Sequence, residues 1–160
     1  MNKFDTKQQE WDLQALESDD PKKQVCRPFT DNQWDLLVED VEAKLLIDGE
    51  LDSILDVGCG NGLLLSRLGK YFGSCHGIDY ADAMIDQADL QMPEGNFSVG
   101  HADSIVHADN TFSRVLCFSI FHYFPNHTYA ESVVSELIRV CRPGGIILIG
   151  DLLDKKFEKQ

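Results

Sequence analysis

The sequence predicts an α/β fold, a three-layer sandwich in which a mainly parallel sheet lies between two layers of helices. Three observations support this class. Short apolar runs alternate with helical patterns between residues 51 and 150, as in sheets whose parallel strands are joined by helices. Several runs are apolar at consecutive positions, which is typical of strands covered on both faces. One run ends in a glycine-rich turn that leads directly into a helix.

Composition narrows the class of protein. The 160 residues are 43% hydrophobic and 26% charged, as in an ordinary globular domain. No apolar run approaches the roughly 18 residues of a membrane span. The N-terminus lacks an apolar signal core, and the five cysteines form no C-x-x-C pair. Both features favour a cytoplasmic protein with reduced thiols.

The net charge is −13. Binding nucleic-acid phosphates requires an excess of Lys and Arg. We therefore expect neither a nucleic acid nor a membrane as a partner.

Residues 1–30 precede the alternating pattern and form a separate segment. An amphipathic helix is predicted over residues 6–17, with a break at Ser18–Pro21. A second helix with one apolar stripe runs from residue 30 or 31 to residue 47. Four large aromatic residues lie in this region: Phe4, Trp11, Phe29 and Trp34. They either cover the second helix or form a lid over a ligand, and the sequence leaves both alternatives open.

The glycine-rich turn at residues 55–62 (LDVGCGNG) organises the chain. It joins a strand that begins near residue 51 to a leucine-rich helix predicted over residues 63–72. The alternating glycines, Gly58 and Gly60 among them, let the main chain turn tightly and lie against a ligand. Asp56 would attract a positive group and repel a diphosphate. Because Leu63 also replaces the third fingerprint glycine, the turn does not fit the dinucleotide motif G-x-G-x-x-G. A strand-to-helix turn without a ligand is the alternative.

Acidic residues also end the next two predicted strands. The second strand, residues 75–79, ends at Asp79, which lies 23 positions after Asp56. That spacing suits a carboxylate that binds ribose hydroxyls, or Asp79 caps the helix predicted over residues 81–91. Met84 in this helix either lies against an adenine ring or fills the core. Asp103 follows the third strand, residues 96–100, and either binds a ligand or forms a local turn.

A fourth strand over residues 111–119 leads into a loop, residues 120–125, that contains His122. A helix over residues 127–141, terminated by Arg142–Gly145, and a fifth strand over residues 146–150 complete the pattern. Parallel strands place their carboxyl ends on one edge of a sheet, where open α/β folds bind their ligands. The candidate residues therefore converge on this edge: Asp56, Gly58, Asp79, Asp103, Ser119 and His122.

The turn D-x-G-x-G-x-G at residues 56–62 resembles motif I of the class I S-adenosylmethionine-dependent methyltransferases. Gly77–Asp79 (G-x-D), Ala102–Ser104 (A-D-S) and Arg142–Gly145 (R-P-G-G) extend the resemblance over about residues 30–150. The small-molecule branch is the most similar, because Ser119–His122 replaces the Pro-Pro-aromatic run of nucleic-acid amino-methyltransferases. The resemblance implies a Rossmann-like fold and S-adenosyl-L-methionine as the cofactor.

The resemblance also implies a reaction and a site. The reaction is methyl transfer to the O, N or C of a small metabolite by in-line displacement, without a metal or a covalent nucleophile. His122 is the candidate general base for the acceptor, or it only shapes the pocket wall. The implied cofactor-binding residues are Asp56, Gly58, Gly60, Asp79, Tyr80, Met84, Asp103, Ser104 and Ser119.

One departure from the family pattern concerns the end of the sheet. The family normally adds two strands after the fifth, whereas this chain ends ten residues beyond it. We expect a methyltransferase domain at residues 31–152 that lacks those strands, and a polar tail at residues 153–160. The chain is then a natural short form, a chain trimmed before its end, or a protein whose open edge a second copy or a partner subunit covers. The alternative function is that of a non-catalytic cofactor-binding or partner subunit.

Overall fold

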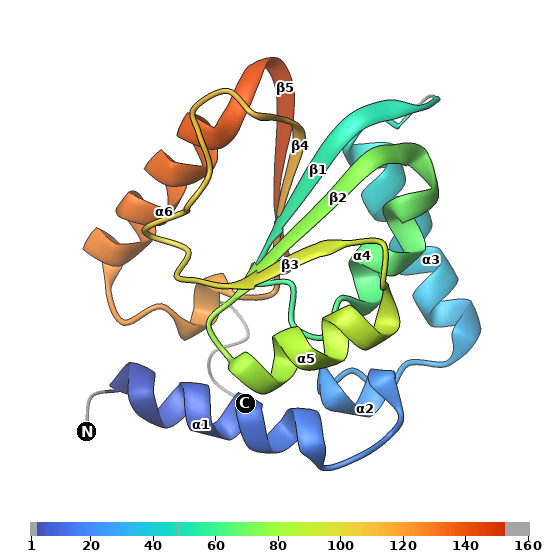
Figure 1. Cartoon of the computed structure of the whole chain (residues 1–160), viewed down its shortest axis with the longest axis vertical. Coiled ribbons are helices and arrows are strands. Elements are labelled where there is room, and N and C mark those ends of the chain that lie inside the picture. The colour runs from blue at the N-terminus through green and yellow to red at the C-terminus, as the bar shows by residue number, and fades with distance from the viewer. Residues whose placement is uncertain (1–2, 48, 153–160) are drawn as a thin grey trace.

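The computed structural model describes residues 3–47 and 49–152, and these form a five-stranded sheet with helices on both faces (Figure 1). The strands are β1 (Leu51–Val57), β2 (Phe72–Asp79), β3 (Asn96–Val99), β4 (Phe112–Phe118) and β5 (Cys141–Gly150). Their order is β3-β2-β1-β4-β5, and every neighbouring pair is parallel. The predicted parallel α/β sandwich is therefore confirmed. The chain changes direction across the sheet between β1 and β4, which is where open α/β sheets form a crevice for ligands.

Helices cover both faces because the central strands are apolar at consecutive positions. Leu55 and Val57 of β1 pack in the cluster that contains α6 (His127–Val140), whereas Ile54 packs in the cluster that contains α3 (Asp31–Lys44) and α4 (Leu63–Leu68). All three side chains are fully buried. The two-sided burial explains why the strands read as continuous apolar runs rather than as alternating ones.

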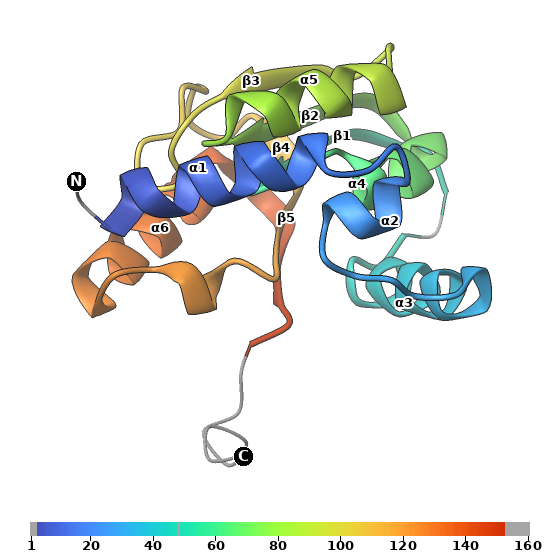
Figure 2. The same ribbon diagram turned by 90° about the horizontal axis from the view of Figure 1, so that it is seen from below.

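Two helices precede α3. The first, α1 (Lys3–Leu16), lies across the carboxyl end of the sheet and contacts α5 (Asp82–Gln91) (Figures 1 and 2). The Asp12 carboxylate of α1 accepts a hydrogen bond from the Ala83 main-chain N–H at 3.0 Å, so one helix supplies a cap to the other. The second, α2 (Pro21–Gln24), was not predicted. The break at Ser18–Pro21 is also its start, because Asp20 caps α2 and Pro21 occupies its first turn.

Several predicted boundaries were wrong. The leucine-rich helix ends at Leu68 rather than at residue 72, and a single 3-10 turn, Gly69–Tyr71, leads into β2. Phe72 begins the strand because it pairs with Leu51, the first residue of β1. The fifth strand begins at Cys141 rather than at residue 146. Its register on β4 shifts between Cys141 and Ile146, so the R-P-G-G sequence forms an irregularity inside the strand.

The edges of the sheet are β3 and β5. Within the described ranges, β5 pairs only with β4. In the same ranges, no helix combines the length and the apolar composition that a membrane crossing requires. The predicted polar tail, residues 153–160, lies outside the described residues.

Candidate functional site

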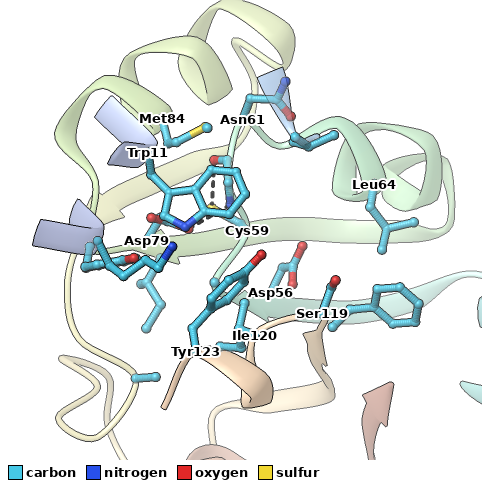
Figure 3. A pocket seen from close by; sticks show the side chains of 18 of the residues that line it. Trp11, Asp56, Cys59, Asn61, Leu64, Asp79, Met84, Ser119, Ile120 and Tyr123 are labelled. Carbon is cyan, nitrogen blue, oxygen red and sulfur yellow. Dashed lines mark hydrogen bonds between the residues drawn. The ribbon is translucent and has the colours of Figure 1, made fainter. Parts of the chain in front are cut away.

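A pocket opens at the carboxyl ends of β1, β2 and β4 (Figure 3). Seven of the predicted cofactor-binding residues line it: Asp56, Gly58, Gly60, Asp79, Tyr80, Met84 and Ser119. The other predicted site residues, Asp103, Ser104 and His122, are not among the lining residues. The predicted convergence on one edge of the sheet therefore holds for most of the set.

The glycine-rich turn has the backbone geometry that its sequence requires. Gly58, Gly60 and Gly62 have φ angles of +78°, +53° and +71°, a left-handed conformation that residues with a Cβ rarely adopt. At Gly58 a Cβ would also lie 2.7 Å from the Ile120 side chain. The N–H groups of Gly58 and Cys59 donate to the Ile78 carbonyl at 2.8 and 3.0 Å. The turn is thus fixed against the end of β2.

Asp56 is a buried carboxylate with an unsatisfied oxygen. The residue is 3% exposed, and its Oδ1 has no hydrogen-bond partner among the described residues. Burial, together with the negative charge of Asp79, raises the pKa of Asp56 to about 7. A buried polar atom without a partner is unfavourable unless a ligand supplies one. Asp56 therefore needs a hydrogen-bond donor or a positive charge from the pocket.

Asp79 ends β2 and is bound to the main chain on both sides. Its Oδ2 accepts from the Gly60 N–H and its Oδ1 from the Ala81 N–H, each at 2.9 Å. Burial raises the pKa of Asp79, although these N–H groups favour the ionised form. Each oxygen can still accept a further hydrogen bond. Asp79 holds the turn before α5 and does not cap that helix at its own N-cap position, which is Ala81.

The segment before α3 contributes one wall of the pocket. Lys7, Trp11, Val25 and Arg27 all line it. The Trp11 ring packs edge-on against Tyr123, with centroids 5.7 Å apart, and both side chains project into the pocket from different elements (Figure 3). Phe29 instead packs against Trp34 of α3, at 6.0 Å. The side chain of Phe4 lies outside the described residues.

Asn61 connects the glycine-rich turn to α2. It is 1% exposed, and its Nδ2 donates to the Pro21 carbonyl at 2.9 Å and to Gln24 Oε1 at 2.8 Å. Its Oδ1 accepts from the Leu63 N–H at 3.2 Å, at the start of α4. Gln24 in turn donates to Gln87 of α5 at 3.1 Å. One buried amide thus joins three elements around the turn.

His122, predicted as a base, is exposed in the 3-10 turn Phe121–Tyr123. Its ring packs on Tyr123 with centroids 4.0 Å apart, and it is Tyr123 that lines the pocket. Asp103 and Ser104 follow His101 and Ala102, which do line it. The structure therefore places these three residues beside the pocket rather than in its wall.

Sequence reasoning missed several lining residues. Asn61 lies within the glycine-rich turn, but at a position where the motif D-x-G-x-G-x-G accepts any residue. Arg27 lies in a segment without a motif. Tyr123 lies in the loop at residues 120–125, and the place of this loop after the fourth predicted strand was the signal that could have indicated it. Within residues 3–47 and 49–152, no group of three or more His, Cys, Asp or Glu side chains is placed to hold a metal ion.

Comparison with known proteins identifies the family. A family model described as a methyltransferase domain matches residues 55–149, more than half of the chain. The protein "Probable methyltransferase ltbC" of Aspergillus luteorubrus is 32% identical in an alignment 123 residues long that covers 66% of this chain and 42% of that protein. A ubiquinone biosynthesis O-methyltransferase of Mesorhizobium japonicum is 28% identical in an alignment 103 residues long that covers 62% of this chain and 40% of that protein. The chain thus spans less than half the length of these two relatives.

A solved structure supports the fold. Phosphoethanolamine N-methyltransferase 1 of Haemonchus contortus, in complex with phosphoethanolamine and S-adenosylhomocysteine, has a TM-score of 0.78 at 14% identity. The match covers 92% of this chain and 32% of that one. The family match over residues 55–149 shows that the chain belongs to the methyltransferase-domain family, the class I S-adenosylmethionine-dependent methyltransferases that its glycine-rich turn resembles.

Proposed function

We propose that the pocket binds S-adenosyl-L-methionine and that the protein transfers its methyl group to the O, N or C of a small acceptor. Asp56 is the observation that supports this most directly. Its buried, unsatisfied oxygen faces a pocket and would accept a hydrogen bond from the α-ammonium group of the cofactor. A diphosphate at this position would instead add negative charge beside Asp56 and Asp79.

The remaining predicted residues fit the other parts of the cofactor. The free lone pairs of Asp79 suit two ribose hydroxyls. Met84 and Tyr80 line the pocket beyond Asp79 and suit the adenine ring, for which a thioether provides a soft apolar contact. Asp103 and Ser104 follow the lining residues His101 and Ala102 and would contact the edge of the base.

When bound, the cofactor supplies a methyl group that is already activated by the sulfonium charge. The chain therefore needs only to align the acceptor and exclude water. Trp11, Ile120 and Tyr123 line the pocket and suit this purpose. The general-base role of His122 stays a proposal that its exposed position does not favour, because a base must reach the acceptor within hydrogen-bond distance.

The alternative is a non-catalytic cofactor-binding subunit. The observation that favours it is the open edge of β5, which among the described residues pairs only with β4. A second copy or a partner subunit would cover such an edge. Incubation with labelled cofactor and pools of small metabolites separates the two functions, because a binding subunit releases no S-adenosylhomocysteine.

Calorimetric titration tests the cofactor assignment. We expect S-adenosylhomocysteine to bind and NAD to give no detectable heat. Asp79→Ala should weaken binding of S-adenosylhomocysteine by about 1.5–3 kcal/mol, the range for hydrogen bonds to a charged group. Asp86→Ala on the exposed side of α5 is the control and should leave the affinity unchanged. Tight NAD binding without S-adenosylhomocysteine binding would refute the assignment.

The raised pKa of Asp56 predicts a pH-dependent affinity. An ammonium group binds the ionised carboxylate, which the free protein forms only near and above pH 7. The affinity for S-adenosylhomocysteine should therefore rise by up to about tenfold per pH unit below pH 7 and level off above it. Asp56→Asn should weaken binding at pH 8 and remove most of this pH dependence. An equal slope in the variant would show that another group is responsible.

The same group should affect the stability of the ligand-free protein. The pKa of Asp56 is about 7 in the folded state, against an ordinary value of 3.8 for an aspartate in water. Between these values the folded state holds a proton that the unfolded chain releases, so the free energy of unfolding contributed by Asp56 falls as the pH rises from about 4 to about 7. In denaturant titrations, Asp56→Asn should therefore gain stability over the wild type with rising pH, by on the order of 2–4 kcal/mol at pH 8.

We also propose that the segment up to residue 30 combines the two roles that its aromatic residues suggested. Trp11 of α1 lines the pocket, which suits a lid over the cofactor. Phe29 packs on Trp34, which suits a cover for α3. The lid part is then α1 and α2, and the covering part is the extended stretch after α2.

Hydrogen exchange with and without S-adenosylhomocysteine tests the lid. We expect protection of main-chain N–H groups in α1 and α2 to increase when the ligand is added, because the lid then closes on a filled pocket. The helix α6, on the far side of the sheet from α3, is the internal control and should not change. Protection gained only at residues 56–62, 79–84 and 103–105 would show that α1 and α2 are packing alone.

A further inference from the structure

Two buried side-chain atoms of the described residues have no hydrogen-bond partner, and both belong to residues that line the pocket. One is Oδ1 of Asp56, to which the proposed function assigns the ammonium group of the cofactor. The other is Nε1 of Trp34 in α3, a residue that is 3% exposed. An indole N–H can only donate, and a buried donor without an acceptor is unfavourable. The Trp34 N–H therefore calls for an acceptor that a second ligand can supply.

The position of the Trp34 ring is fixed by its neighbours. The ring lies near the start of α3, which Thr30 begins with a capping box. The Phe29 ring packs against it with centroids 6.0 Å apart, and Cζ of Arg67 lies 5.6 Å from its centroid. The indole N–H is thus held in place in the ligand-free protein.

The side chains on the α3 side of the pocket are apolar. Leu37 of α3, Leu64 of α4 and Phe118 at the end of β4 line the pocket together with Trp34. All three pack against the core cluster that contains α3 and α4. In Figure 3, Leu64 lies on the other side of Asp56 from Met84. This end of the pocket is therefore separate from the part that suits the adenine ring.

Both arginines near this end are already paired. Arg27 lines the pocket, but its Nη2 donates to Ser119 Oγ at 2.9 Å and forms an ion pair with Asp151. Arg67 forms an ion pair with Asp35 at 3.2 Å. A ligand charge in apolar surroundings is costly unless a countercharge accompanies it. The indole N–H thus suits a neutral oxygen better than a carboxylate.

We propose that this end of the pocket binds the acceptor, and that the acceptor is an apolar, uncharged molecule with an oxygen that accepts a hydrogen bond from Trp34 Nε1. This inference rests on the proposed function and names the class of acceptor, a neutral carbonyl, ether or phenol on an apolar skeleton. An amine that is protonated at neutral pH does not fit, because an ammonium group cannot accept from the indole N–H.

The indole N–H signals of the two tryptophans, Trp11 and Trp34, test the inference by nuclear magnetic resonance. The wild type is saturated with S-adenosylhomocysteine and titrated with acetophenone, 1-phenylethylamine or benzoate. These probes carry a carbonyl, an ammonium group and a carboxylate on the same ring. Acetophenone should move the Trp34 signal downfield, as a new hydrogen bond does, and should bind at least about tenfold more tightly than the other two. S-Adenosylhomocysteine alone should not move this signal downfield.

Trp34→Phe removes the N–H and keeps an aromatic ring, and it also identifies the Trp34 signal. The variant should weaken acetophenone binding by about 2- to 10-fold, the effect of losing one neutral hydrogen bond. Its affinity for S-adenosylhomocysteine should stay within about twofold of the wild type. Leu36→Ala is the control, because Leu36 is an exposed residue of α3 that does not line the pocket. It should change neither affinity.

Three results would overturn the inference. Weaker binding of S-adenosylhomocysteine by a folded Trp34→Phe variant, or a downfield shift with that ligand alone, would assign the indole N–H to the cofactor. Binding of the amine or of benzoate as tight as that of acetophenone would assign the acceptor to another class. No binding of any probe to the saturated protein would show that this end holds no acceptor. A wild type that does not bind S-adenosylhomocysteine overturns the proposed function itself.

Discussion

Two buried carboxylates, Asp56 and Asp79, lie at the carboxyl ends of neighbouring strands, and the cost of burying their charges is the constraint on which the rest of the site depends. Burial raises the pKa of each, and the charge of Asp79 raises the pKa of Asp56 further. The two carboxylates differ in their hydrogen-bond donors. The protein gives Asp79 main-chain donors from Gly60 and Ala81 and leaves an oxygen of Asp56 without one among the described residues. The ligand-free pocket is therefore incomplete at this atom, and the ligand that completes it must be a donor or a cation.

The main-chain donors are available because of the glycine-rich turn. A turn that contains three left-handed residues presents its N–H groups inward, and only glycine adopts this conformation at little cost. The turn is then fixed from outside by Asn61, whose amide group reaches α2. Residues before and after the first strand thus shape the same few main-chain atoms. The segment before α3 is therefore part of the site, because four of its residues line the pocket.

The sequence predicted the sheet, the glycine-rich turn and seven residues of the pocket because these depend on local pattern. Periodic apolar runs fix strands, and strand ends fix an edge, so Asp56 and Asp79 could be placed in advance. Asn61 and Arg27 could not, because their partners Gln24 and Ser119 are 37 and 92 positions away. The start of β2 at Phe72 was missed for the same reason, since it is set by pairing with Leu51. The sequence around Phe72 has a helical pattern, but β1 extends back to Leu51 and offers Phe72 a pairing partner, so the strand forms instead.

The Asn61 contacts have a further consequence. The shape of the glycine-rich turn and the position of α2 cannot change independently, because the same amide group is hydrogen-bonded to both. Thermodynamic linkage is reciprocal. Any molecule that steadied the outer surface of α1 and α2 would therefore raise the affinity of the pocket for its ligand, and the ligand would raise the affinity for that molecule by the same factor. The outer surface of α2 is thus linked to the pocket although it holds no residue that the ligand would touch.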